Sequence, residues 1–233
     1  LMVLVSCSKY SGNGAAGSGS GKLSSEIDSV SYSFGVDMAK TIMEYGVKEL
    51  NAAAFAEGLV TMLNNDTANI KIKAEDARPL IMAYFQRVQE LKNEKNRKAG
   101  EDFLAENKKK EGVKLTESGV QYIVLKEGTG PVPSDTSVVK VHYQGSLIDG
   151  TVFENSMDNG QPAEFPVNRV IKGWQDILTI MPVGSKWKVF IPQELGYGAN
   201  VRPGGKIEPF MALIFEMELL EIVTPEPKVK PGK

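Results

Sequence analysis

The first half of the chain shows apolar residues at the three- to four-residue spacing of amphipathic helices. A first predicted helix, from about Ser29, carries its apolar side chains at Val30, Phe34, Met38 and Ile42. Gly46 follows as a C-terminal stop, because glycine accepts the left-handed backbone that ends many helices. Asn51 is placed to cap a second helix, whose apolar side holds Phe55, Leu59, Met62 and Leu63.

A third predicted helix begins near Glu75, with Pro79 in its first turn, where proline is tolerated. Its apolar stripe is spaced at three and four residues, at Ile81, Tyr84, Val88 and Leu91. The sequence then becomes mostly charged and only Gly100 interrupts it, so the helix is expected to continue to about Glu111. At about 1.5 Å per residue it would be a rod on the order of 50 Å long.

From Val120 the period changes to two, which predicts strands. The predicted strands span residues 120–125, 138–143, 186–191 and 211–222, and turns rich in glycine and proline separate them. One short helix is expected over residues 172–179. The pattern predicts an α+β fold: an all-α N-terminal domain and a long linking helix, then a compact antiparallel sheet domain with a small helix.

The N-terminus holds the single cysteine. The segment Leu4-Val5-Ser6-Cys7 resembles a bacterial lipobox, in which a signal peptidase cuts before the cysteine and lipid is attached to it. A Gly/Ser-rich stretch follows as a tether, and the sequence is expected to begin inside the signal peptide. This interpretation predicts a lipoprotein anchored through Cys7 in the outer membrane of a bacterial envelope. The alternative is a disordered N-terminal fragment with an accidental cysteine.

These patterns divide the chain into a signal remnant and tether (1–22), a helical dimerisation domain (23–74), the linking helix (75–112), the sheet domain (113–223) and a disordered tail (224–233). About 70 residues of helix bury too little surface to form a core alone, so two copies are expected to pair. Gly35 would permit close helix approach, and several methionines suit an adaptable interface. The alternative is a monomeric three-helix bundle that packs on itself.

The amino-acid composition excludes several classes of binding and catalytic site. The net charge of -2 and the pI near 5.7 argue against nucleic-acid binding, which needs clustered positive charge. One cysteine and one histidine offer neither an internal disulfide nor the usual zinc ligands, so no metal and no cofactor is expected. The chain has no G-x-S-x-G elbow, and His142 lies within a predicted strand, where a structural role fits better than catalysis.

Aromatic residues are the most distinctive feature of the predicted sheet domain. They are spread over several segments, often beside glycine: Tyr143, Phe153, Phe165, Trp174, Tyr197 and Phe215. They could simply form the core, because aromatic side chains dominate protein cores. They could also line an apolar cup for a small ring such as that of proline. Spacing alone does not decide between these two interpretations.

Five sequence blocks of this domain carry a family resemblance. In order they are VHYQG (141–145), GTVFENS (150–156), VIKGW (170–174), IPQELGYG (191–198) and LIFEMELL (213–220). Together they resemble an FKBP-type peptidyl-prolyl cis-trans isomerase domain over about residues 115–223. In the helical half, SYSFGV (31–36) and FLAENKKKEGV (103–113) resemble the macrophage infectivity potentiator (Mip) subfamily.

The resemblance implies a half-open antiparallel sheet wrapped around a short helix. It implies an enzyme that accelerates X–Pro rotation in envelope proteins during folding, with unfolded or partly folded proline-containing polypeptides as substrates. It also implies a homodimer formed through the N-terminal helices, and macrolide inhibitors as ligands. Such an enzyme needs no nucleophile or metal, which fits the scarcity of conventional catalytic groups.

The same resemblance assigns the pocket residue by residue. Trp174 would form the floor, the Ile171 N–H would hold a substrate carbonyl, and the Tyr197 hydroxyl would bond the peptide backbone. The expected catalytic residues are Tyr143, Phe153, Glu154, Trp174, Tyr197 and Phe215. The expected substrate-binding residues are Val170, Ile171, Phe165 and Ala163.

Three positions depart from the family pattern. Glu154 stands where aspartate is usual, and Ala163 replaces an aromatic wall. The loop of residues 202–210 holds an extra glycine, with Glu208 in place of a proline. These departures bear on substrate preference and inhibitor affinity more than on catalysis.

Two alternative functions belong to other classes. The chain could be a dimeric folding chaperone, a binding module with weak or no isomerase activity. It could also be an anchored scaffold whose pocket has lost activity through the changes at Glu154 and Ala163.

Overall fold

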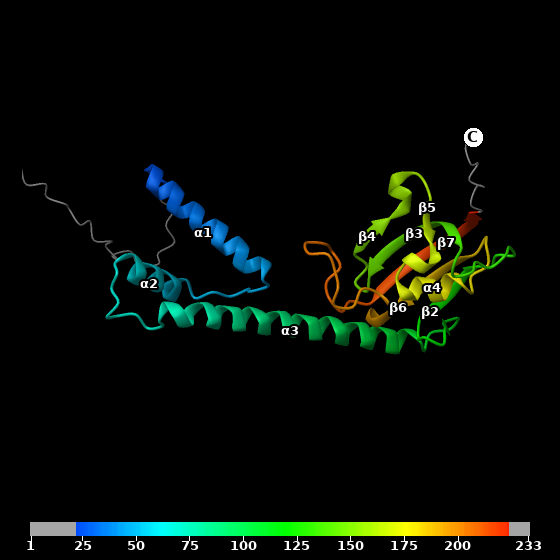
Figure 1. Ribbon diagram of the computed structural model, residues 1–233, viewed down its shortest axis with the longest axis horizontal. Helices are drawn as coiled ribbons and strands as arrows, with labels where there is room; N and C mark the ends of the chain where they lie inside the picture. The colour runs from blue at the N-terminus through cyan, green and yellow to red at the C-terminus, as the bar shows by residue number, and fades with distance from the viewer. Residues whose placement is uncertain (1–21, 224–233) are drawn as a thin grey trace, which may run out of the picture. The chain divides into compact units, whose positions relative to one another are not determined.

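The computed structural model describes residues 22–223, which form two compact units that divide between Leu91 and Lys92 (Figure 1). The predicted lipidation site Cys7 and the predicted tail of residues 224–233 lie outside the described residues. The predicted domain boundaries stay predictions. Within the described range, no helix is both long enough and apolar enough to span a membrane.

Side-chain caps set where the first two helices begin. α1 (Glu26–Glu44) starts earlier than predicted, because Ser25 and Asp28 form a capping box. The Ser25 hydroxyl accepts from the Asp28 N–H at 3.1 Å, and the Asp28 carboxylate accepts from the Ser25 N–H at 3.0 Å. α2 (Ala52–Leu63) begins after Asn51, whose side-chain oxygen accepts from two backbone N–H groups of the first turn. This cap confirms the prediction at Asn51.

The apolar faces of these two helices are exposed in a single chain. Neither α1 nor α2 contains a buried residue, and Phe34 is 68% exposed. Packing among the described residues of this unit is sparse: Tyr45 stacks on Phe85 with ring centroids 4.4 Å apart, and Val47 is buried. One chain by itself therefore does not form the self-packed three-helix bundle that was the alternative to a dimer.

α3 (Ala74–Asn107) ends before the position expected from the sequence, so the prediction that it reaches Glu111 is wrong. The Asn107 side chain is buried, and its amide donates to the Gln121 side-chain oxygen at 2.9 Å. Gly112 then adopts a φ of 79°, a conformation that suits glycine, and the chain turns into the sheet. The buried amide pair and this turn end the helix.

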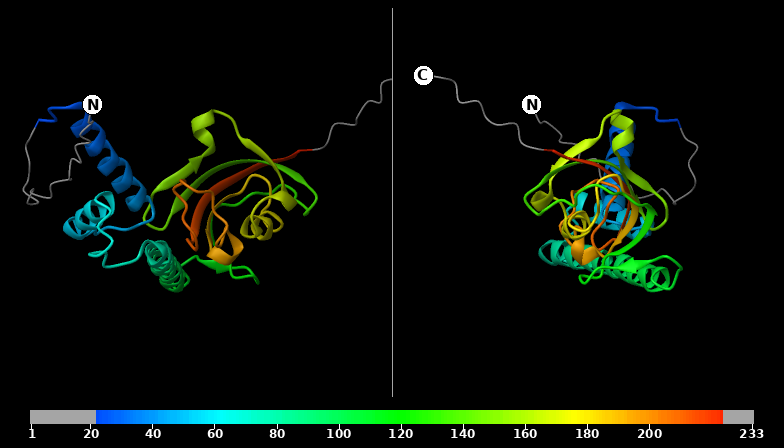
Figure 2. Two further views of the ribbon diagram at one scale, coloured as in Figure 1. Left: turned by 60° about the vertical axis from the view of Figure 1, so that its left-hand side comes forward. Right: turned by 90° about the vertical axis from the view of Figure 1, so that its right-hand side faces the viewer.

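The second unit is built on an antiparallel sheet of seven strands in the order β1-β2-β6-β7-β3-β4, with β5 paired to β3. The strands are β1 Lys114–Leu115, β2 Gln121–Lys126, β3 Val138–Leu147, β4 Val152–Asn155, β5 Ala163–Pro166, β6 Lys186–Ile191 and β7 Leu213–Val223. The sheet curves around α4 (Lys172–Leu178), as Figure 2 shows. This architecture confirms the predicted fold class.

Three strands escaped prediction, and each of them is short. β1, β4 and β5 contain two to four residues, too few to display an alternating pattern. β3 also runs further than predicted, to Leu147, because its alternation of buried and exposed positions continues through Gly145. Glycine is depleted in strands, so its presence concealed the second half of β3.

The core lies between α4 and the face of the sheet that it covers. Ile177 and Leu178 of α4 are fully buried with strand residues such as Val141 and Leu219. Buried and less buried residues alternate along both β3 and β7, as expected for strands with one face on a core. This packing places the first turn of α4, with Trp174, over the middle strands.

The C-terminal half of α3, from Lys92, belongs to this second unit. The Phe103 ring lies 6.0 Å from the Phe190 ring, and the Gln121 amide donates to the Leu104 carbonyl at 2.8 Å. A Cβ placed on Gly100 would lie 3.0 Å from the Ala212 Cβ, so the helix backbone approaches the domain closely there. This half of the helix is therefore part of the body that carries the sheet.

Candidate active site

Five aromatic side chains meet on the concave face of the sheet and form what we call the aromatic cup: Tyr143, Phe153, Phe165, Trp174 and Phe215. Trp174 contacts three of these rings edge to face. The centroid distances are 5.0 Å to Tyr143, 5.7 Å to Phe165 and 5.2 Å to Phe215, with interplanar angles of 86°, 89° and 87°. This geometry is the favourable one for aromatic pairs, because the positive edge of one ring meets the negative face of another.

Each ring comes from a different element. Tyr143 and Phe215 lie on the paired strands β3 and β7, Phe153 on β4, Phe165 on β5 and Trp174 on α4. The rings are brought together by the sheet register and by the position of α4 over the sheet, although they are separated by up to 72 residues in the sequence.

Two glycines make room for the cup. A Cβ on Gly145 would lie 2.4 Å from the Phe153 ring, and a Cβ on Gly173 would lie 2.5 Å from the Ile191 side chain. Any larger residue at Gly145 would push Phe153 out of place, and any at Gly173 would lift α4 off β6. In the sequence Gly173 precedes Trp174, and Gly145 ends the first family block, but neither position showed that its glycine serves close packing.

The floor of the cup is buried and its rim is partly open. Trp174 is 4% exposed, Tyr143 7% and Phe215 3%. The remaining predicted residues that pack against this cluster are only partly buried: Phe153, Ala163, Phe165, Val170 and Ile171. Tyr197 is 41% exposed. The structure therefore gathers these predicted site residues in one place, with apolar walls below and accessible groups above.

Glu154 and Tyr197 join the cup through electrostatic contacts. Burial raises the pKa of Tyr143 well above its ordinary value, and the neighbouring Glu154 carboxylate, which favours the protonated hydroxyl, raises it further. Burial and the charge of Glu154 also raise the pKa of Tyr197, while Arg202 opposes that shift. Both hydroxyls therefore keep their protons at neutral pH.

Two N–H groups at this site lack partners within the described part of the chain. The Ile171 carbonyl accepts from the backbone N–H groups of Trp174 and Gln175 at the start of α4, while its own N–H bonds to none of the described residues. The indole N–H of Trp174 is buried and also has no partner among the described residues. A buried donor without an acceptor is unfavourable, so a ligand that supplies one would be stabilised here.

Two family models match the chain. One, described as FKBP-type peptidyl-prolyl cis-trans isomerase, covers residues 130–220. The other, described as the domain amino terminal to FKBP-type peptidyl-prolyl isomerase, covers residues 27–124. The chain belongs to the FKBP-type peptidyl-prolyl cis-trans isomerase family. This membership confirms the resemblance seen in the sequence.

Known relatives match both parts of the isomerase. The FKBP-type 22 kDa peptidyl-prolyl cis-trans isomerase of Escherichia coli K12 is 42% identical over 196 residues, which are 83% of this chain and 94% of that protein. The outer membrane protein MIP of Legionella longbeachae is 36% identical over 208 residues, 86% of this chain and 87% of that protein. The crystal structure of FkpA from Escherichia coli matches with a TM-score of 0.67 and 28% identity, and it covers 86% of this chain and 98% of that one.

These matches show that the chain is a peptidyl-prolyl cis-trans isomerase, and they do not favour the alternative of a binding module without that activity. They do not test the roles of individual residues. The assignments to the ten predicted site residues remain predictions.

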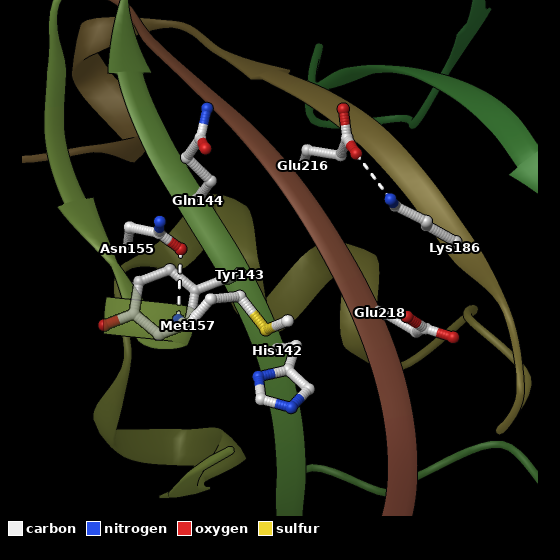
Figure 3. A pocket seen from close by; sticks show the side chains of 8 residues that line it. All are labelled: His142, Tyr143, Gln144, Asn155, Met157, Lys186, Glu216 and Glu218. Carbon is white, nitrogen blue, oxygen red and sulfur yellow. Dashed lines mark hydrogen bonds and ion pairs between the residues drawn. The ribbon is translucent and has the colours of Figure 1, made fainter. Parts of the chain in front are cut away.

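The opposite face of the isomerase's sheet carries a polar hollow, not a second aromatic site. His142 and Gln144 of β3 lie there with Lys186 of β6 and with Glu216 and Glu218 of β7 (Figure 3). Lys186 and Glu216 form an ion pair of 2.6 Å across the strands. Glu216 pairs with Lys186, and Glu218 lies 3.7 Å from Lys126. Because these charges have partners on the sheet, we interpret the hollow as a solvated outer face.

Ser156 is a residue of structural importance that sequence reasoning did not single out. It is buried, and its hydroxyl accepts from the Tyr143 N–H at 2.9 Å and lies 3.1 Å from His142 Nδ1. Ser156 thus helps to hold the segment that follows β4 against β3, through its contacts with the Tyr143 N–H and the His142 ring. In the sequence, only the position of Ser156 at the end of the second family block (150–156) pointed to this residue.

Replacing Tyr143 by phenylalanine should make the free energy of unfolding fall less steeply as the pH rises into the alkaline range. The folded chain holds the Tyr143 proton more tightly than the unfolded chain, in which a tyrosine ionises near pH 10. The resulting stabilisation is complete below about pH 10 and is lost as the pH rises toward the higher folded-state pKa, by up to about 1.4 kcal/mol per pH unit. Urea unfolding followed by tryptophan fluorescence, from about pH 9 to 11, measures this slope. Equal slopes for the wild type and Tyr143→Phe would contradict the expectation.

Proposed function

We propose that the aromatic cup binds the proline ring of a polypeptide and accelerates rotation about the preceding peptide bond without covalent chemistry. The observation that carries this proposal is the arrangement of Trp174, which is fixed edge to face by three rings while partly buried residues leave the cup open above it. The cup offers an apolar surface and no nucleophile. A reaction that breaks no covalent bond fits such a site.

The physical basis is the change in polarity of the amide as it turns. Conjugation makes the planar peptide bond stiff, with a rotation barrier of about 20 kcal/mol, and charge-separated. The twisted transition state loses conjugation and becomes less polar than the planar ground state. An apolar, water-poor cup therefore stabilises the transition state more than the ground state, which is the requirement for catalysis.

Polar groups at the rim hold the flanking peptide while the bond turns. The unpartnered Ile171 N–H is proposed to bind a substrate carbonyl, and the protonated Tyr197 hydroxyl to bond the peptide backbone. Glu154 is proposed to orient the Tyr143 hydroxyl, whose protonated form its charge favours. Val170 and Ala163 would complete the walls, with the alanine leaving one side wider. Fixed contacts on both sides of the bond lower the entropy cost of reaching the twisted state.

Removing one wall of the cup should reduce turnover without unfolding the domain. Phe153→Ala is expected to lower kcat/KM for a short X–Pro peptide by about tenfold or more, because an aromatic contact of about 1.5 kcal/mol is lost in the transition state. Phe153 is only partly buried, so the fold should survive, and tryptophan fluorescence in urea checks this. A proline-isomerisation assay on the full chain measures the effect.

The matched control is Leu125→Ala, which removes an apolar side chain that is 49% exposed on β2, a strand that carries none of the cup's rings. It should keep wild-type turnover. A macrolide inhibitor of the family is expected to compete with the peptide in the same assay. Full turnover by Phe153→Ala would overturn the assignment of the chemistry to the cup.

The helical unit is proposed to form a homodimer. Its support is the exposed apolar surface of α1, where Ile27, Phe34 and Met43 are each more than 65% exposed. Gly35 lies among them with no atom within 4 Å of its Cβ position, which leaves room for close approach by a second helix. A solitary chain would leave this surface in water, which is rare for a patch of this kind.

A charge on this surface should separate the two copies. In sedimentation experiments the wild type is expected at twice the chain mass of 25.4 kDa, and Phe34→Asp at the mass of one chain. Turnover of a short peptide should be unchanged in the variant, because the cup lies in the other unit. A wild type that sediments as a single chain would contradict the proposal.

An envelope location with a lipid anchor is proposed for the chain, whose substrates would be proline-containing polypeptides folding there. The support is the lipobox-like segment at Cys7, together with the name of the relative called outer membrane protein MIP. When the chain is produced in bacteria behind a complete signal peptide, labelled palmitate should be incorporated into it. Cys7→Ser should remain unlabelled. Equal labelling of both would exclude Cys7 as the site of attachment.

A further inference from the structure

The loop of residues 196–212, which we call the Tyr197 loop, has few restraints of its own. It begins beside the cup with Tyr197 and returns to β7 just before Phe215, and none of its residues belongs to a strand. The backbone hydrogen bonds within it are few, and only one joins its two ends: the Phe210 N–H donates to the Gly198 carbonyl at 2.8 Å. Its position at the cup must therefore depend on what holds it from outside.

One side of the loop is held by the C-terminal half of α3, within the same compact unit. Lys92 Nζ lies 2.7 Å from a carboxylate oxygen of Glu208. The Asn96 amide donates to the Pro209 carbonyl at 3.1 Å and to Glu208 at 3.4 Å. The Arg97 guanidinium lies over the Phe210 ring, 4.6 Å from its centroid. Three side chains on two successive turns of one helix thus contact three consecutive loop residues.

The contact with Phe210 supports a strained backbone. Phe210 has a φ of 62°, in the left-handed region that a bulky residue rarely adopts. Such a conformation is unfavourable for a residue with a bulky side chain, and it persists only where the surroundings hold it. Here the surroundings are the Arg97 contact and the hydrogen bond to Gly198, the residue next to Tyr197.

The other side of the loop is tied to the cup. Lys206 Nζ donates to the Val152 carbonyl at 2.6 Å, at the start of the short strand that carries Phe153 and Glu154. Ile207 packs against the hydrophobic core. A displacement of the loop by α3 would therefore be transmitted to two walls of the site, through Gly198 to Tyr197 and through Val152 to Phe153.

Glu208 supplies the carboxylate on which this arrangement depends. It is the residue that stands where the family pattern has a proline, and a proline has no carboxylate for Lys92 and Asn96 to bind. Both partners lie in the charged part of α3, where the sequence showed no apolar stripe. Nothing in the sequence connected them to a loop more than 100 residues away.

We propose that Lys92, Asn96 and Arg97 are positioning residues for the isomerase site, which act through the Tyr197 loop and set the preference for the residue before proline. This inference rests on the proposed function of the cup. None of the three side chains needs to touch the substrate. They fix where Tyr197 and the loop stand when the segment preceding proline enters, so the linking helix contributes to substrate choice.

The test compares peptides that differ only in the residue before proline, one with alanine and one with leucine, on the full-length chain. Lys92→Glu and Asn96→Ala should each change the ratio of the two kcat/KM values by about twofold or more, because residues in one network couple by about 0.5 kcal/mol or more. The change is expected mainly in KM, since the cup that lowers the barrier is intact. The charge-swapped double variant Lys92→Glu with Glu208→Lys should restore the ratio toward the wild-type value.

Lys98→Glu is the matched control, because Lys98 lies on the same helix, is 70% exposed and pairs only with Asp102 among the described residues. It should leave the ratio unchanged. Unfolding in urea, followed by tryptophan fluorescence, separates the effect on preference from a loss of stability.

The outcomes distinguish this inference from the function on which it rests. If the wild type turns over both peptides and the Lys92 and Asn96 variants keep its ratio, the positioning role is wrong and the isomerase site stands. If both variants change the ratio but the charge swap restores nothing, the Lys92–Glu208 pair is not the contact that positions the loop. A wild type with no turnover would overturn the proposed function of the cup and this inference with it.

Discussion

The edge-to-face contact of Trp174 with three other rings is the constraint on which the site depends. The indole can stand perpendicular to Tyr143, Phe165 and Phe215 only if α4 lies against the sheet at one height and β3, β5 and β7 keep their register. Gly173 and Gly145 permit that arrangement, because a side chain at either position would collide with a neighbour. The same contacts that complete the core therefore shape a surface suited to a proline ring. The same aromatic side chains therefore serve both the hydrophobic core and the proposed site.

The body that carries this site is larger than the sheet. The C-terminal half of α3 covers Phe190 and Ala212, supplies the Asn107 partner of the buried Gln121 and reaches the Tyr197 loop. A fragment that begins after the helix would lose both hydrogen bonds of the Gln121 amide, each worth about 0.5–1.5 kcal/mol net. The linking helix is thus a structural part of the isomerase as well as a connection to the helical unit.

Much of this fold could be predicted from local patterns, because those patterns reflect local physics. Helical periodicity located α1, α2 and most of α3, and the Asn51 cap was visible from its side-chain chemistry. Prediction failed where contacts between residues distant in sequence determine where an element ends or whether a strand forms. The end of α3 depends on the Asn107–Gln121 pair, and β4 and β5 are stabilised as strands by pairing with β3. For the site, spacing left cup and core as equal interpretations, and only the ordered family blocks chose between them. The loop contacts of Lys92 and Asn96 join residues too distant in sequence for any pattern to connect.

X–Pro peptides are proposed to bind in the aromatic cup, and the two tryptophans of the chain allow a direct measurement of this binding. Trp174 forms the floor of the cup, whereas Trp187 lies on β6 and stacks on Tyr122 with centroids 4.6 Å apart. Nuclear magnetic resonance resolves the two indole N–H signals during titration with a short Ala-Pro peptide. The Trp174 signal is expected to shift with peptide concentration, while that of Trp187 stays in place. A Trp174 signal that does not move, in a sample that catalyses isomerisation of the same peptide, would contradict binding in the cup.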